Sequence, residues 1–82
     1  MQTVLVTGAN RGVGLALVQR FRERGDRVIA ACRNSSAELD ATGAQVEAGV
    51  DVADDAAVAD LARRLEGVRL DVVVLNAGVL SP

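Results

Sequence analysis

The chain lacks most of the side chains that carry acid–base and metal chemistry. Its 82 residues include no histidine, tyrosine, tryptophan or lysine, and its nine basic residues are all arginines. Most groups that exchange protons near neutral pH are therefore missing. A cluster of cysteine and histidine ligands for a metal ion is excluded as well. We expect neither a catalytic residue nor a metal site within these residues.

Cysteine and long apolar runs are also scarce. Cys32 is the only cysteine, which excludes an internal disulfide and suits a reducing cytoplasm. No apolar run approaches the roughly 20 residues of a membrane span, and the first residues do not resemble a signal peptide. The net charge is −2 and the arginines are scattered, so no basic surface for nucleic acid is indicated. We expect a cytoplasmic protein that binds neither nucleic acid nor a membrane.

The residues that are present alternate between strand and helix patterns. Short aliphatic, β-branched runs predict strands at residues 1–6, 27–32, 45–50 and 70–75. Apolar residues at helical spacing and typical end signals predict helices at residues 12–24, 36–41 and 54–66. This alternation predicts an α/β fold with a parallel sheet and flanking helices. The glycine-rich stretch at residues 7–14, directly after the first strand, predicts the Rossmann-like strand order 3-2-1-4.

The helices carry further local signals. Ser36 and Asp54 precede the second and third helices and are expected to be their N-caps. Apolar stripes are expected to face the sheet. In the first helix the stripe contains Val13, Leu17 and Phe21, and in the third it contains Val58, Leu61, Ala62 and Leu65.

The fourth predicted strand does not suit a complete domain. It is the most β-branched of the four, yet the order 3-2-1-4 places it at the edge of the sheet. Long, exposed hydrophobic edge strands promote aggregation, and native proteins avoid them. We therefore expect residues 1–82 to be the N-terminal part of a single Rossmann-fold domain, and the chain to be a fragment of a longer protein.

A glycine-rich loop connects the first strand to the first helix. It runs Thr7-Gly8-Ala9-Asn10-Arg11-Gly12-Val13-Gly14. Such a loop presents backbone N–H groups at a helix N-terminus, where an anion is favoured. Gly8 would permit the tight turn, Gly12 the close approach of a pyrophosphate, and Gly14 the packing of helix on strand. An ordinary strand-to-helix turn is the alternative for this glycine spacing alone; the flanking strand and helix favour a nucleotide site.

Three motifs, each at the end of a predicted strand, resemble those of the short-chain dehydrogenase/reductase family. The glycine-rich loop matches the family's Thr-Gly-x-x-x-Gly-x-Gly cofactor loop. Asp51-Val52 resembles its adenine-contacting acidic position, and Asn76-Ala77-Gly78 resembles its Asn-Asn-Ala-Gly motif. The Asn-Arg-Gly sequence within the loop is most similar to the small carbonyl-reducing members.

The chain departs from the family pattern in two respects. Leu75 stands where the family usually has the first asparagine of its fourth-strand motif. The family's catalytic serine, its Tyr-x-x-x-Lys pair and a helical asparagine lie beyond the fourth strand, whereas this sequence ends at Pro82. The resemblance thus implies a cofactor half-site, and the 82 residues alone are expected to be inactive.

Two arginines indicate which dinucleotide is preferred. NAD sites usually carry an acidic residue at the end of the second strand, to accept from the ribose 2′-hydroxyl. Here that place is taken by Cys32, followed by Arg33, and Arg11 lies in the glycine-rich loop. Guanidinium groups bind a 2′-phosphate well, so the pair predicts NADP (NADPH). The alternative is that both arginines are solvated surface residues.

The sequence thus predicts the NADP-binding portion of a short-chain oxidoreductase that transfers hydride between nicotinamide and a carbonyl or alcohol substrate. A non-catalytic nucleotide-binding module and a non-functional fragment are the alternatives. Asp51 could instead cap the third helix, although Asp54 and Asp55 are better placed for that role. The substrate is not specified, and an oligomer is compatible with the sequence. The expected cofactor-binding residues are Gly8, Asn10, Arg11, Gly12, Val13, Gly14, Arg33, Asp51, Val52, Asn76, Ala77 and Gly78.

Overall fold

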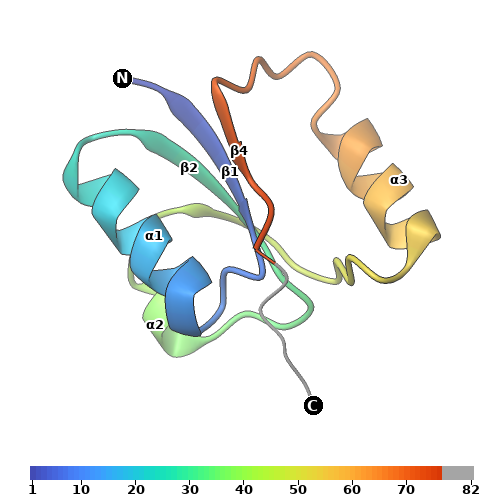
Figure 1. Cartoon of the computed structure of the whole chain (residues 1–82), viewed down its shortest axis with the longest axis horizontal. Coiled ribbons are helices and arrows are strands. Elements are labelled where there is room, and N and C mark those ends of the chain that lie inside the picture. The colour runs from blue at the N-terminus through green and yellow to red at the C-terminus, as the bar shows by residue number, and fades with distance from the viewer. Residues whose placement is uncertain (77–82) are drawn as a thin grey trace.

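The computed structural model describes residues 1–76, in which strands and helices alternate (Figure 1). The strands are β1 (Thr3–Thr7), β2 (Arg27–Ala31), β3 (Gln45–Glu47) and β4 (Val72–Val74). The helices are α1 (Gly12–Glu23), α2 (Ala37–Asp40) and α3 (Asp55–Arg64). Among the described residues, no helix is both long enough and apolar enough to cross a membrane.

The four strands form one parallel sheet in the order β3-β2-β1-β4. Val4 pairs with Val28 of β2 on one side and with Val72 of β4 on the other. Helices α1 and α2 lie against one face of the sheet and α3 against the other (Figure 1). This arrangement confirms the predicted Rossmann-like fold, with strand order 3-2-1-4.

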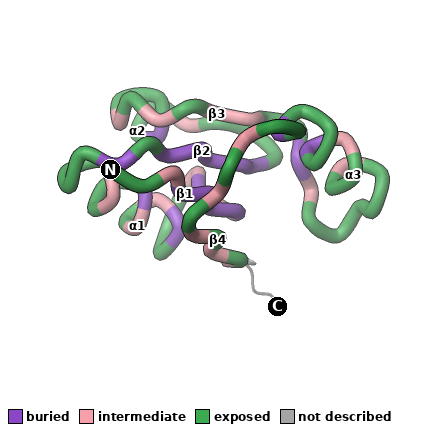
Figure 2. The backbone as a smooth tube through the Cα atoms, turned by 90° about the horizontal axis from the view of Figure 1, so that it is seen from above, coloured by how far each residue is buried: buried purple, intermediate pink, exposed green. Residues whose placement is uncertain are grey.

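Each face of the sheet has its own apolar core, because successive residues of a strand point to opposite faces. The core under α1 and α2 contains Val4, Val6, Ala9, Val18, Val28, Ala30, Cys32 and Leu39. The core under α3 contains Leu5, Ile29, Ala31, Val50, Leu61 and Leu65. Strands β1 and β2 carry most of the burial, as Figure 2 shows. The carboxyl ends of these two strands are thereby buried between the two cores, and the glycine-rich loop follows one of them.

Three of the predicted stripe positions are wrong. Val13 is 68% exposed, and α1 instead buries Gly14 and Val18 against the sheet. The glycine allows α1 to pack closely at this end, which turns Val13 outward. Leu61 of α3 and Leu65, directly after it, are buried as predicted, whereas Val58 is 42% exposed and Ala62 is exposed as well.

The third strand is shorter than the sequence predicts, because it ends at Glu47 rather than Val50. Gly49 has a φ of +78°, which interrupts the extended backbone. Beyond it, the N–H of Val50 donates to the carbonyl of Cys32, so the chain returns to the end of β2. The break turns residues 51–53 across the carboxyl ends of the strands. Helix α3 likewise ends at Arg64, two residues before the predicted end.

Strand β4 lies at an edge of the sheet, as predicted, and pairs only with β1 among the described strands. Apolar side chains in this strand and directly after it remain accessible to solvent. Val73 is 49% exposed and Leu75 is 80% exposed. The described part of the molecule therefore presents an apolar edge beside β1.

Candidate functional site

The glycine-rich loop brings α1 into close contact with the ends of β1 and β4. Gly8 has a φ of +61°, and a Cβ added there would collide with the carbonyl oxygen of Asn76. A Cβ added at Gly14 would collide with the carbonyl oxygen of Gly8 and lie 2.6 Å from the Asn76 amide nitrogen. Both positions therefore require glycine for steric reasons, as predicted for the turn and for helix packing.

Asn76 joins β4 to this loop through three hydrogen bonds. Its side-chain Nδ2 donates to the carbonyl of Gly8 at 3.2 Å. Its backbone N–H donates to Thr7 Oγ1 at 3.0 Å, and the Thr7 hydroxyl donates to the Asn76 carbonyl at 3.2 Å. The Asn76 side chain is thus committed to shaping the loop. Ala77 and Gly78, predicted as cofactor-binding residues beside it, lie outside the described residues.

The N-terminus of α1 differs from those of the other two helices. Ser36 caps α2 and Asp54 caps α3 through side-chain acceptors, as predicted. Arg11, the N-cap of α1, makes no such bond, and the first turn of α1 contains no acidic residue. Gly12 has a φ of +61°, and a Cβ there would have no neighbour within 4 Å. The first N–H groups of α1 therefore lack a side-chain acceptor, and the space beside Gly12 is open, which suits an anionic ligand.

Beside this helix end lies a concavity of about 650 Å³, here called the polar concavity. It is formed where the glycine-rich loop, the segment after β2 and the segment after Gly49 meet. It is lined by Gly8, Asn10, Arg11, Cys32, Arg33, Asn34, Val50, Asp51, Val52 and Ala53. Six of the predicted cofactor-binding residues are thus brought together from three distant segments. Gly12, Val13, Gly14 and Asn76 do not line it.

Arg11 and Arg33 are the basic residues of the polar concavity. Both are exposed, and neither guanidinium makes an ion pair or hydrogen bond within residues 1–76. By contrast, Arg64 binds the carboxylates of Asp60 and Glu47. Arg11 and Arg33 approach the concavity from different loops, so an anion placed there could be bound from two sides.

Asp51 contributes the acidic group of the concavity. Its Oδ1 accepts a hydrogen bond from the N–H of Ala53 at 2.9 Å, which orients the carboxylate. The cap of α3 is Asp54, whose Oδ1 accepts from the N–H of Ala56 at 3.0 Å. The capping alternative for Asp51 is therefore not realised, and the carboxylate lies in the wall of the concavity.

Four residues that line the polar concavity are not among the predicted cofactor-binding residues. Asn34, Val50 and Ala53 are adjacent in sequence to predicted site residues, which is the one signal that points to them. Cys32, which also lines the concavity, is buried. Burial, with a smaller contribution from Asp40, raises the pKa of its thiol, so Cys32 is neutral at physiological pH.

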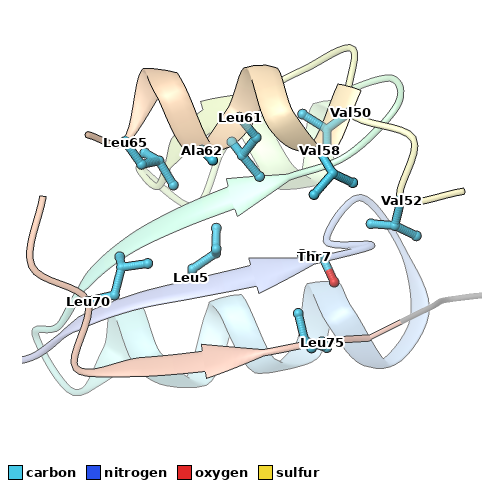
Figure 3. A pocket seen from close by; sticks show the side chains of 10 residues that line it. All are labelled: Leu5, Thr7, Val50, Val52, Val58, Leu61, Ala62, Leu65, Leu70 and Leu75. Carbon is cyan, nitrogen blue, oxygen red and sulfur yellow. The ribbon is translucent and has the colours of Figure 1, made fainter. Parts of the chain in front are cut away.

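A second concavity, here called the apolar groove, lies between α3 and the sheet (Figure 3). Its volume is about 610 Å³ and almost all of its wall is aliphatic. Leu61 of α3 and Leu65, directly after it, point toward Leu5 of β1, and Leu75 borders the groove from the end of β4 (Figure 3). An aliphatic wall cannot compensate the desolvation of phosphate charges. Of the two concavities, only the polar one suits a charged dinucleotide.

Comparison with known proteins agrees with this geometry. The family model for short chain dehydrogenases matches residues 2–82. The chain is 46% identical to a 1-hydroxy-2-glutathionyl-2-methyl-3-butene dehydrogenase of Rhodococcus sp. (strain AD45), with 98% of this chain and 36% of the relative covered. It is 42% identical to a 1-deoxy-11-beta-hydroxypentalenate dehydrogenase of Streptomyces avermitilis, over 98% of the chain and 33% of that relative. The chain thus spans about a third of the length of these relatives.

A solved structure shows the same arrangement. A Burkholderia multivorans protein described as a short-chain dehydrogenase/reductase, determined with NADP bound, superposes with a TM-score of 0.88 at 30% identity. The match covers 99% of this chain and 38% of that protein. The family model matches nearly the whole chain, and the solved structure shares its parallel sheet. This chain belongs to the short-chain dehydrogenase/reductase family.

Proposed function

We propose that this chain is the NADP-binding portion of an oxidoreductase that transfers hydride between nicotinamide and a carbonyl or alcohol substrate. The observation that carries the proposal is the convergence of Arg11 and Arg33, both without partners in residues 1–76, on the polar concavity. The family membership supports the reaction class, and NADP is bound in one similar structure. When bound, the nicotinamide supplies or accepts the hydride.

The residues of the site fit this cofactor. The two guanidinium groups would bind the 2′-phosphate by charge-assisted hydrogen bonds. No carboxylate stands at the end of β2, where Cys32 is buried and neutral, so nothing there repels the phosphate. Asp51 would accept a hydrogen bond from the adenine amino group, with Val52 packing against the base.

The other predicted residues would act on the pyrophosphate side. Gly12, Val13 and Gly14 form the first turn of α1, whose N–H groups would donate to phosphate oxygens. Gly8 and Asn10 shape the loop before it. Asn76 would support the site indirectly through Gly8, and Ala77 and Gly78 would border the cofactor by resemblance to the family motif.

Arg33→Ala in the protein at its full natural length tests the cofactor assignment. A hydrogen bond to a charged group contributes about 1.5–3 kcal/mol, so NADPH binding should weaken by roughly one to two orders of magnitude. NADH binding should change little, since NADH has no 2′-phosphate. Cys32→Asp combined with Arg33→Ala should shift the preference toward NADH. The measurement is the Kd of each cofactor at one fixed salt concentration.

Arg20→Ala provides the matched control, because Arg20 is an exposed arginine in the last turn of α1, away from the polar concavity. It should leave both dissociation constants unchanged. Equal losses of NADPH and NADH affinity in Arg33→Ala would assign this arginine to the fold or the pyrophosphate, and the NADP proposal would be wrong.

A further inference from the structure

Ser36 makes a contact that its role as a helix cap does not require. Its hydroxyl accepts from the N–H of Leu39 at 3.1 Å, which is the cap of α2. The same hydroxyl donates to the carbonyl of Asn10 at 2.9 Å, across 26 positions of sequence. Within residues 1–76, this is the one side-chain hydrogen bond between the glycine-rich loop and the segment 33–36.

The hydrogen bond joins the two segments that carry the arginines of the polar concavity. Asn10 precedes Arg11, and Ser36 follows Arg33 by three residues. The carbonyl of Arg33 accepts from the N–H of Gly49 at 2.9 Å, so the segment is also attached on its other side. Leu39, fully buried, anchors α2 in the core. The segment that carries Arg33 is therefore fixed to Gly49, just after β3, at one end and to the glycine-rich loop at the other.

We infer that Ser36 is a positioning residue that sets the separation of Arg11 and Arg33 and so determines the selectivity of the site for a 2′-phosphate. The inference rests on the proposed function. Two long arginine side chains bind one phosphate well only when their backbones are held at a suitable distance before binding. The Ser36 hydroxyl links the segment that carries Arg33 to the carbonyl of Asn10, next to Arg11, and it needs no contact with the cofactor.

Two substitutions separate this role from capping. Ser36→Ala removes both hydrogen bonds and weakens the cap of α2, whereas Ser36→Gly removes the bond to Asn10 with a much smaller loss of cap stability. If Ser36 positions the arginines, both variants should lose NADPH affinity to the same extent, roughly three- to tenfold. Their affinity for NADH should stay unchanged, and Ser36→Thr, which retains the hydroxyl, should restore NADPH binding.

The measurement is the Kd of NADPH and NADH for the protein at its full natural length, with unfolding followed in parallel. If the loss of affinity follows stability, large in Ser36→Ala and small in Ser36→Gly, Ser36 is only a cap and the inference is overturned. A similar loss for NADPH and NADH overturns it as well. Ser35→Ala is the matched control, since the Ser35 hydroxyl donates to Asp40 and not to the glycine-rich loop.

A double-mutant cycle distinguishes failure of this inference from failure of the proposed function. In an Arg33→Ala background, Ser36→Gly should cause little further loss of NADPH affinity, because the arginine that it positions is gone. Fully additive losses would contradict the positioning role while leaving the NADP assignment intact. If Arg33→Ala itself does not discriminate between the cofactors, the proposed function is wrong instead.

Discussion

Gly14 determines how closely α1 approaches the ends of β1 and β4. The helix packs at this point against the carbonyl of Gly8 and the amide of Asn76, leaving no space for a side chain. The same contact turns Val13 outward and makes Val18 the buried residue of the next turn. A single small residue thus sets the position of the helix end that would face the pyrophosphate.

Gly14→Ala tests this steric requirement, because two effects oppose each other. Helix propensity alone would favour alanine by about 1 kcal/mol. The new Cβ would collide with backbone atoms, and overpacking of this kind typically costs about 1–3 kcal/mol. We expect a net loss of stability and weaker binding of NADPH and NADH alike, measured by chemical unfolding and cofactor titration. Ala16→Gly is the control at an exposed position of the same helix. It should lose only the stability that helix propensity contributes, about 1 kcal/mol. A more stable Gly14→Ala protein would contradict the close packing.

Among the elements, α3 is attached to the sheet by a narrow contact. Leu61 is its buried residue, with Leu65 at its C-terminal end. Arg64 adds hydrogen bonds to Asp60 and Glu47, which raise the pKa of its guanidinium and link α3 to the end of β3. The apolar groove lies beside this contact, so the helix is covered on one side only.

Leu61→Ala should therefore release much of the contact between α3 and the sheet. Truncation of a buried leucine typically costs about 2–5 kcal/mol, and we expect the lower half of this range because the groove already opens beside Leu61. Val58→Ala is the control on the same helix; since Val58 is 42% exposed, its loss should be well under that of Leu61→Ala. The free energy of unfolding from denaturant titration decides the comparison, and equal losses would show that the two residues pack alike.

At the scale of the whole molecule, the edge of β4 and the apolar groove form a continuous hydrophobic region. Val73 and Leu75 are exposed there, and Leu75 also borders the groove. The unpaired N–H and C=O groups of an exposed edge can pair with a further strand. We expect the isolated 82 residues to be marginally stable and to associate through this edge.

Val73→Lys should reduce that association, because a lysine on an edge strand disfavours pairing with another chain. The oligomer distribution of the isolated 82 residues over a range of concentrations, from sedimentation or light scattering, provides the measurement. Val13→Lys is the matched control, since Val13 is an exposed valine that lies on α1 and not on the edge strand. A monodisperse monomer with a sharp, cooperative thermal transition at high concentration would count against the expectation for the unaltered sequence.

Local sequence was sufficient for the order of the elements and for much of the site. Strand patterns, the capping residues Ser36 and Asp54 and the glycine spacing act over a few neighbouring residues, so they can be interpreted without the fold. The strand order follows from the position of the glycine-rich loop after β1. That Arg11 and Arg33 lie in one concavity also follows, because the carboxyl ends of parallel strands meet at one edge.

The tertiary structure decided what depends on contacts between distant residues. The exposure of Val13 results from the approach of α1 to Gly8 and Asn76, and the early end of β3 from the turn at Gly49. The bond between Ser36 and Asn10 joins residues 26 positions apart, and a capping serine looks the same in sequence with or without it. Periodicity reports which face of an element is apolar; the distance between two elements is set by their packed side chains, which only the folded chain brings together.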